Sequence, residues 1–307
     1  MEKVEFAAQT RNSPVHATIW PTTDLKTYED PQRTKEVGQL KTAAAYRVLE
    51  EIGDSFAVSV DGKTVYVESN HCMINLPEYL GDLCSYQIAN SDSSLYMVHE
   101  YEIPAVTAVV TAGYERVKQE NGEYLVPLLY PTAKKVALAA KSALEQGYRL
   151  KIHDAFRPNK ATLEIFDRME GLLEQEIPEK TVWGGVMEDL PDPDPVLTYS
   201  AVMTNCGAWA LNDFLAKGVS QHNYGIAVDL TLETLDGEPL KMQTSIHDLS
   251  WYSVVERNNE NAKLLASIMK AAGMEELDSE WWHFQDNETK RKITLHYVRE
   301  GLGPAET

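Results

Sequence analysis

One short segment of this sequence indicates more about the architecture than any other, and it reads Ser220-Gln221-His222-Asn223-Tyr224-Gly225-Ile226-Ala227-Val228-Asp229. Its end predicts an apolar strand over 226–232 that holds a single carboxylate, Asp229. An unpaired carboxylate among aliphatic side chains is costly to bury, and a metal ion removes that penalty. The alternative is that Asp229 caps a turn or pairs with an arginine.

A second segment further along the chain reads Glu280-Trp281-Trp282-His283-Phe284. With His222 and Asp229, His283 completes a typical set of three zinc ligands, which in catalytic sites leaves a fourth position for water. A hydrolase needs that position, because zinc lowers the pKa of bound water towards about 7. Glu280 is suited to be the general base towards this water and then the acid towards a leaving amine. A single histidine is more often a packed or surface residue, so the two segments together carry the prediction.

A third segment, Asp154-Ala155-Phe156-Arg157-Pro158, follows a predicted strand over 148–152. The guanidinium group of Arg157 has a permanent charge and five donors in a fixed fork, which suits an oxyanion or a carboxylate. Asp154 is placed to hold Arg157 or a neighbouring loop. The alternative is an ordinary Asp–Arg pair that stabilises the loop.

These three ordered segments resemble the D-alanyl-D-alanine dipeptidases of the VanX type, a group within the zinc D,D-peptidases. The resemblance covers roughly residues 95–300. It implies one zinc ion per chain on His222, Asp229 and His283, with Glu280 as the catalytic base. It also implies that Arg157 stabilises the charge that develops on the tetrahedral intermediate.

The same resemblance implies that Ser220 helps to bind the substrate, and we place Asp154 and Tyr224 with it as candidate substrate-binding residues. The alternative for Tyr224 is that its side chain only packs against its neighbours. One departure from the family pattern is Phe156, which stands where tyrosine is common. The substrate implied is the dipeptide D-Ala-D-Ala, or a peptidoglycan stem peptide that ends in it.

Upstream of these segments, short apolar strands flank the dipeptide Asp61-Gly62. Asp-Gly is favoured in two-residue type I′ hairpin turns. With that turn, Val58 lies opposite Val65 and Phe56 opposite Val67 on one face of the hairpin. Over roughly residues 33–80 this pattern resembles a bacterial SH3-like module, which implies contact with the cell wall or a β subdomain that only supports the catalytic part.

The predicted fold class is α+β. We expect an N-terminal extension over 1–32, an SH3-like β barrel over 33–80, and a zinc D,D-peptidase domain over 81–307 with a central antiparallel sheet flanked by helices. The predicted helices are one that begins at Pro131 and stops before Gly147, one that begins after Asn159, one over 209–217, and one over 260–272 that stops at Gly273. Residues 178–198 contain four prolines and several acids, which predicts a long loop.

Composition excludes several classes of protein. The formal net charge of −19 argues against nucleic acid as a partner, because phosphate binding needs clustered lysine and arginine. No run reaches the roughly 20 apolar residues of a membrane helix. No signal peptide is evident; removal of one would predict the cell envelope or the exterior, and otherwise the cytoplasm is expected. The sequence has no Cys-x-x-Cys pair, so we expect its cysteines to be buried thiols, and they are Cys72, Cys84 and Cys206.

Three alternatives remain open from the sequence. The nearest is a D,D-carboxypeptidase or another stem-peptide endopeptidase with the same zinc site. A different class is a cell-wall binding protein with a vestigial zinc site. The third is a structural zinc protein, although structural sites usually fill the fourth position with another Cys or His. The remaining histidines lack a comparable setting, and they are His16, His71, His99, His153, His247 and His296.

Overall fold

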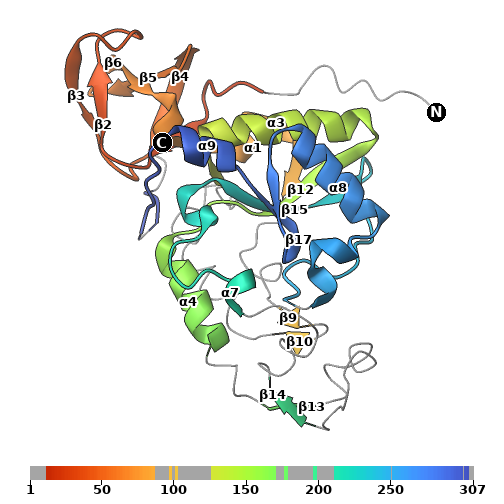
Figure 1. Ribbon diagram of the computed structural model, residues 1–307. Coiled ribbons are helices and arrows are strands. Elements are labelled where there is room, and N and C mark those ends of the chain that lie inside the picture. Colours follow the sequence, from red (N-terminus) through yellow and green to blue (C-terminus); the bar gives the residue numbers. More distant parts are fainter. Residues whose placement is uncertain are drawn as a thin grey trace.

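A computed structural model of the chain describes residues 12–86, 97–98, 101–102, 126–170, 176–178, 196–198, 211–249, 251–299 and 301–303. Two sheets dominate it, an eight-stranded one built mainly from the N-terminal third and a five-stranded one that carries the functional segments (Figure 1). Two short antiparallel ribbons are separate from both sheets. They pair β9 (Met97–Val98) with β10 (Tyr101–Glu102), and β13 (Glu176–Pro178) with β14 (Val196–Thr198).

The larger sheet has the strand order β11-β7-β1-β4-β5-β6-β2-β3. Its strands are β1 (Thr18–Pro21), β2 (Leu25–Tyr28), β3 (Glu36–Leu40), β4 (Tyr46–Ile52), β5 (Ser55–Val60), β6 (Lys63–Glu68), β7 (Cys72–Asn75) and β11 (Pro127–Leu129). The predicted hairpin is confirmed: Phe56 pairs with Val67 and Val58 with Val65. Its turn residues Asp61 and Gly62 have φ values of 49° and 72°, as a type I′ turn requires.

This sheet does not follow the boundaries expected at residues 33 and 80. Strands β1 and β2 precede residue 33, and β11 comes from the chain just before the first long helix. The all-β character of the N-terminal part is as predicted, whereas its likeness to SH3 modules stays a prediction. What the register does establish is that β11 pairs with β7, so the N-terminal strands share a sheet with the part of the chain that leads into the peptidase segments.

The smaller sheet has the order β16-β17-β15-β12-β8. Its strands are β8 (Cys84–Tyr86), β12 (Tyr148–Asp154), β15 (Ala227–Thr234), β16 (Glu275–Leu277) and β17 (Glu280–Gln285). The predicted central antiparallel sheet is confirmed for β12, β15, β16 and β17, while β8 pairs with β12 in parallel. Helices α3 (Tyr130–Glu145) and α8 (Glu260–Ala271) contact each other and the sheet (Figure 1).

The shorter helices complete the fold. They are α1 (Leu76–Leu80), α4 (Asn159–Glu170), α7 (Leu211–Phe214) and α9 (Asn287–Lys292), with 3-10 turns η2 (Ser69–His71), η3 (Gly81–Leu83), η7 (Gln221–Tyr224), η8 (Trp251–Ser253) and η9 (Val255–Arg257). Three predicted helices are confirmed. The helix predicted from Pro131 is α3, the one predicted after Asn159 is α4, and the one predicted over 260–272 is α8. Gly147 and Gly273 follow α3 and α8 with φ values of 85° and 84°, as helix-ending glycines do.

Two expectations differ from the structure. The helix predicted over 209–217 is limited to α7 within the described residues, because the chain leaves helical geometry after Phe214. The long loop predicted over 178–198 has strand at both ends, where Pro178 pairs with Val196 in an antiparallel register. Proline is accepted there because both strands of a two-stranded ribbon are edges. The residues between these ends lie outside the described part of the chain.

Strand β11 joins the larger sheet to two of the functional segments. The Leu129 amide donates to the Gly225 carbonyl at 2.8 Å, and the Phe156 amide donates to the Pro127 carbonyl at 3.0 Å. The C-terminal part of the chain adds a link, since the Trp20 indole donates to the Gly303 carbonyl at 2.9 Å. The N-terminal sheet is therefore bonded to the same backbone that carries the candidate site.

Two further predictions concern the core and the membrane. Cys72 and Cys84 are buried free thiols, as expected, whereas Cys206 lies outside the described residues. In the part of the chain that the structure describes, no helix combines the length and the apolar character needed to cross a membrane.

We predict that Gly225→Ala destabilises the fold more than an ordinary left-handed glycine would. Gly225 has φ of 66°, and a Cβ there would lie 3.0 Å from the Leu129 amide nitrogen. The left-handed backbone costs an L-residue about 1–2 kcal/mol, and the contact with β11 adds to it. Urea denaturation would measure the loss in the free energy of unfolding.

The matched control is Gly53→Ala. Gly53 has φ of 61° but nothing within 4 Å of the added Cβ, so it reports the backbone cost alone. Equal losses in the free energy of unfolding in the two variants would show that the close contact between Leu129 of β11 and Gly225 does not restrain the site.

Candidate metal centre

Three ligand atoms from the predicted residues converge in the interior. His222 Nε2 lies 3.2 Å from His283 Nδ1. Asp229 Oδ1 lies 3.0 Å from His283 Nδ1 and 3.4 Å from His222 Nε2. All three side chains are buried, with at most 5% of each residue exposed. The structure thus brings together the three residues that the sequence placed on one metal ion.

The spacing of these atoms fits zinc. Tetrahedral ligands about 2.0–2.1 Å from zinc are about 3.3 Å apart, close to all three sides of the observed triangle. His222 Nδ1 donates to the Ala155 carbonyl at 2.6 Å, which leaves the Nε2 lone pair facing the other two ligands. A carbonyl that fixes the tautomer in this way is the usual outer partner of a metal-bound histidine. His222, Asp229 and His283 would hold the ion.

Strand register places two of the ligands. Asp229 on β15 lies directly opposite His283 on β17, so the two side chains share one face of the sheet. Their neighbours Val228, Leu230 and Phe284 alternate to the opposite, apolar side. The ladder is irregular near the site, as is common beside functional residues. On β17 the register with β16 shifts next to Glu280, and Glu280 Oε2 comes within 3.7 Å of His283 Nδ1.

The segment that contains Arg157 braces the site through its backbone as well as its side chain. The Arg157 amide donates to the His222 carbonyl at 3.3 Å. Asp154 accepts from Arg157 Nε at 3.1 Å through one oxygen and from the Ala155 amide at 2.9 Å through the other. Asp154 is absent from the pocket walls described below. The structure shows that Asp154 holds Arg157, and a role of Asp154 in substrate binding stays a prediction.

The turn η7 sets the position of His222. Ser220 Oγ accepts from the His222 amide at 3.2 Å, and the Asn223 side chain accepts from the Ser220 amide at 2.7 Å, which forms a reciprocal capping box. Asn223 Nδ2 also donates to the Arg157 carbonyl and to Thr162 Oγ1, each at 2.8 Å. Asn223 was not predicted as a site residue, although its buried amide connects η7, the Arg157 segment and α4.

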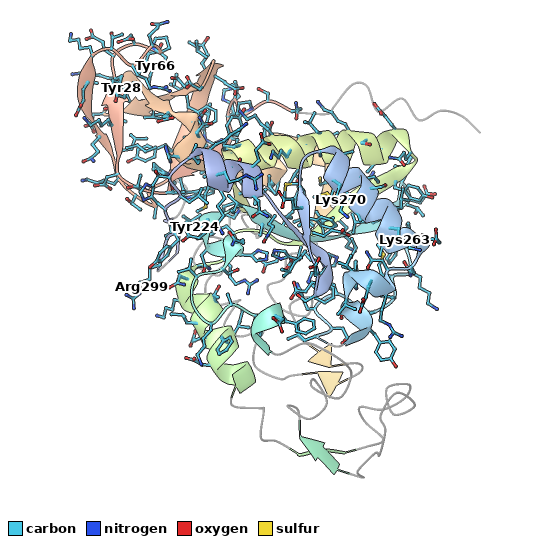
Figure 2. All side chains as sticks on the ribbon, in the orientation of Figure 1. Tyr28, Tyr66, Tyr224, Lys263, Lys270 and Arg299 are labelled. Carbon is cyan, nitrogen blue, oxygen red and sulfur yellow. The ribbon has the colours of Figure 1, made fainter. Side chains whose placement is uncertain are left out.

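A pocket of about 260 Å³ opens onto the three ligands. Arg157 is the only lysine or arginine among its described lining residues, and Ser220 and Glu280 also line it. Phe214, Val219 and Leu277 supply apolar wall. Tyr224 is not part of these walls; its ring packs edge-on against Tyr297 at 5.9 Å, on the flank that also carries Arg299 (Figure 2). The observed contact of Tyr224 is packing, and its role in substrate binding stays a prediction.

Charge in the site is strongly organised. Burial alone would raise the pKa of Asp229, but the adjacent His222, His247 and His283 hold that pKa well below its ordinary value. Burial and the nearby Asp229 carboxylate raise the pKa of Glu280 well above the ordinary range of a glutamate. The two carboxyl groups therefore have opposite tendencies: Asp229 stays an anionic ligand, and Glu280 has a high affinity for a proton.

Two other histidines lie near the centre. His153 bonds to Thr231 Oγ1 at 3.3 Å, and burial lowers its pKa to about 3, so it packs beside the site and is not one of the clustered ligands. In the sequence, His247 has no setting comparable with that of the ligands, yet the structure places it against one of them. Its Nε2 lies 3.1 Å from Asp229 Oδ2. No spacing pattern in the sequence marks His247, because it reaches the strand from a loop.

Comparison with known proteins agrees with this geometry. The sequence family described as D-Ala-D-Ala dipeptidase matches residues 172–299, which include the metal ligands and Glu280. The chain is a zinc-dependent peptidase that is similar to this family. A D-alanyl-D-alanine dipeptidase of Enterococcus faecium is 29% identical to the peptidase over 168 residues, 50% of this chain and 70% of the relative. One from Escherichia coli (strain K12) is 28% identical over 159 residues, 50% of this chain and 61% of the relative.

Similarity to solved structures is lower. A vancomycin-resistance D,D-pentapeptidase, VanY, in complex with Zn(II) aligns with a TM-score of 0.32 and 15% identity, over 65% of this peptidase and 92% of that chain. A VanY structure in complex with D-alanine-D-alanine gives a TM-score of 0.31 and the same identity, over 65% and 90%. Overlap of this extent is too small to support a shared fold, so the similarity to D-alanyl-D-alanine dipeptidases rests on sequence.

We predict that the peptidase binds one zinc ion per chain and that Asp229→Ala abolishes this binding. Removing the carboxylate leaves two imidazoles, too few for a stable catalytic site. Zinc should also stabilise the parent protein, by about 2.7 kcal/mol when free zinc is at 100 times its Kd. Elemental analysis and thermal unfolding with and without a chelator would test both points. In contrast, His296→Ala, outside the cluster, should retain one zinc; equal zinc contents in both variants would contradict the ligand set.

Proposed function

We propose that this peptidase hydrolyses the peptide bond of D-alanyl-D-alanine in peptidoglycan metabolism. The observation that carries the proposal is the position of Glu280, buried in a pocket within 3.7 Å of the ligand triangle. A purely structural zinc site has no use for such a group. The D-alanyl-D-alanine dipeptidases of Enterococcus faecium and Escherichia coli, with 29% and 28% identity, support the choice of substrate.

The residues of the pocket divide the chemistry between them. Zinc, when bound, supplies a water molecule whose pKa is lowered towards about 7. Glu280 takes the proton of that water and later gives it to the departing D-alanine nitrogen, which suits a carboxyl group with a high proton affinity. Arg157, held by Asp154, presents the positive charge that stabilises the developing oxyanion. Ser220, at the pocket wall, is placed to bind the substrate.

The size of the pocket favours a short substrate. Drug-sized ligands occupy cavities of about 300–1,000 Å³, and the described walls enclose about 260 Å³. Arg157 is the only lysine or arginine among those described walls, so the pocket holds one permanent positive charge, which the developing oxyanion uses. A free dipeptide meets these conditions. A longer stem peptide cleaved by the same site, as in a D,D-carboxypeptidase or an endopeptidase, is the second candidate.

The N-terminal sheet bears on the second candidate. SH3-like modules that contact the cell wall would favour a wall-attached substrate. The hydrogen bonds from β11 to Gly225 and Phe156 instead support a sheet that buttresses the catalytic part. We therefore favour the free dipeptide.

Product analysis separates the two candidates. With D-Ala-D-Ala, the zinc-loaded peptidase should release free D-alanine, and a chelator should stop the reaction. With a stem pentapeptide ending in D-Ala-D-Ala, release of D-alanine should be at least 100-fold slower, because a described pocket of about 260 Å³ favours the smaller substrate. Faster turnover of the pentapeptide would replace the dipeptidase assignment with a D,D-carboxypeptidase.

We predict that Glu280→Gln loses at least 100-fold in kcat while keeping one zinc ion per chain. General acid–base catalysis typically contributes 10²–10⁴-fold, and glutamine has the same shape but cannot carry the proton. The control is Glu275→Gln on the neighbouring strand, whose side chain is 51% exposed, and it should retain full turnover. A Glu280→Gln enzyme with normal kcat would remove Glu280 from the mechanism.

A further inference from the structure

His247 contacts the metal centre from outside the ligand triangle. Its Nε2 lies 3.1 Å from Asp229 Oδ2, the oxygen of that carboxylate that is not part of the triangle. An ionised carboxylate only accepts hydrogen bonds, so the ring nitrogen is the donor. His247 is 1% exposed and is one of the residues that line the pocket. The hydrogen bond between His247 and Asp229 is therefore shielded from most competing water.

Two features of the fold hold the imidazole in this position. The backbone at His247 is left-handed, with φ of 61°, a conformation that costs most L-residues about 1–2 kcal/mol. The ring also packs edge-on against Trp282, with centroids 5.8 Å apart and an interplanar angle of 89°. Trp282 belongs to β17, the strand of Glu280 and His283, whereas Asp229 belongs to β15. His247 therefore spans the two strands that carry the site.

The second oxygen of Asp229 has a consequence for the metal. A carboxylate with both oxygens unengaged can bind a cation through either or both. A donor on Oδ2 leaves Oδ1 to face the ion, which keeps three protein ligands and one further position. Hydrogen bonds of this kind orient the ligands, and their loss typically costs 10- to 100-fold in metal affinity.

We propose that His247 is a positioning residue that fixes Asp229 as a single-oxygen ligand through the hydrogen bond to Oδ2. This role concerns the metal centre and is independent of which peptide is cleaved. It extends the site beyond the three ligands to a fourth buried side chain from the loop after β15.

The test measures zinc affinity by competition with a chromophoric chelator, without any peptide substrate. His247→Phe keeps the ring and its packing on Trp282 but has no donor, so its Kd for zinc should rise 10- to 100-fold. His247→Gln places an amide N–H near the position of Nε2 and should recover most of that loss. The Co(II)-substituted proteins add a second readout, because a change in how Asp229 binds alters the visible absorption spectrum in His247→Phe and not in His247→Gln.

Controls keep the outcome decisive. His153→Phe removes another buried imidazole near the site, one that bonds to Thr231, and should bind zinc as the parent does. If His247→Phe does not fold, His247→Asn replaces it, because asparagine adopts left-handed geometry readily and is too short to reach Asp229. Zinc affinity and Co(II) spectra unchanged in folded His247→Phe or His247→Asn would overturn the proposal. Parent protein that binds zinc tightly yet cleaves no D-Ala-D-Ala would instead contradict the proposed function alone.

Discussion

The architecture depends on holding three electron-rich atoms about 3 Å apart where water is almost excluded. In the deprotonated forms that bind metal, His222 Nε2, Asp229 Oδ1 and His283 Nδ1 present lone pairs to one another, and a cation between them offsets their repulsion. Two different features of the fold fix the three ligands. Strand register fixes Asp229 and His283, and the Ala155 carbonyl fixes His222.

The same constraint explains why the N-terminal sheet is not a loosely attached appendage. A ligand displaced by a few tenths of an ångström leaves the zinc geometry, so the segments around it need support on several sides. Strand β11 supplies one side, because its backbone bonds to Gly225 after η7 and to Phe156 beside Arg157. Since β11 is also an edge of the eight-stranded sheet, that sheet stabilises the metal centre without contacting the ion.

The sequence predicted the site better than it predicted the fold around it. The ligands and Glu280 were found because they stand in short segments whose residue types have a shared chemistry. The hairpin at Asp61-Gly62 was found because a local dipeptide sets its register. Asp154 and Tyr224 stand beside site residues in the sequence but are not among the described pocket walls. Adjacency in sequence does not tell which side chain faces a pocket.

Other features could not be found because they depend on contacts between distant segments. His247 reaches Asp229 from a loop, and no local sequence pattern predicts its left-handed backbone. The pairing of β11 with β7 joins residues separated by a long stretch of chain, so the boundary expected at residue 80 was drawn without it. Periodicity reports which residues are buried, and it does not report the partner they are buried against.

The position of Glu280 also decides between an enzyme and a binding protein that has retained its zinc ligands. Glu280 is 5% exposed, and burial raises its pKa well above the ordinary value, so keeping it there costs free energy of folding. The register shift in β17 that brings it to His283 is a second departure from regular structure. A protein that only bound the cell wall would gain stability by replacing Glu280 with an apolar residue and straightening the strand. Burying Glu280 and shifting the register of β17 have a functional reason if Glu280 takes a proton from water and returns it to a leaving amine.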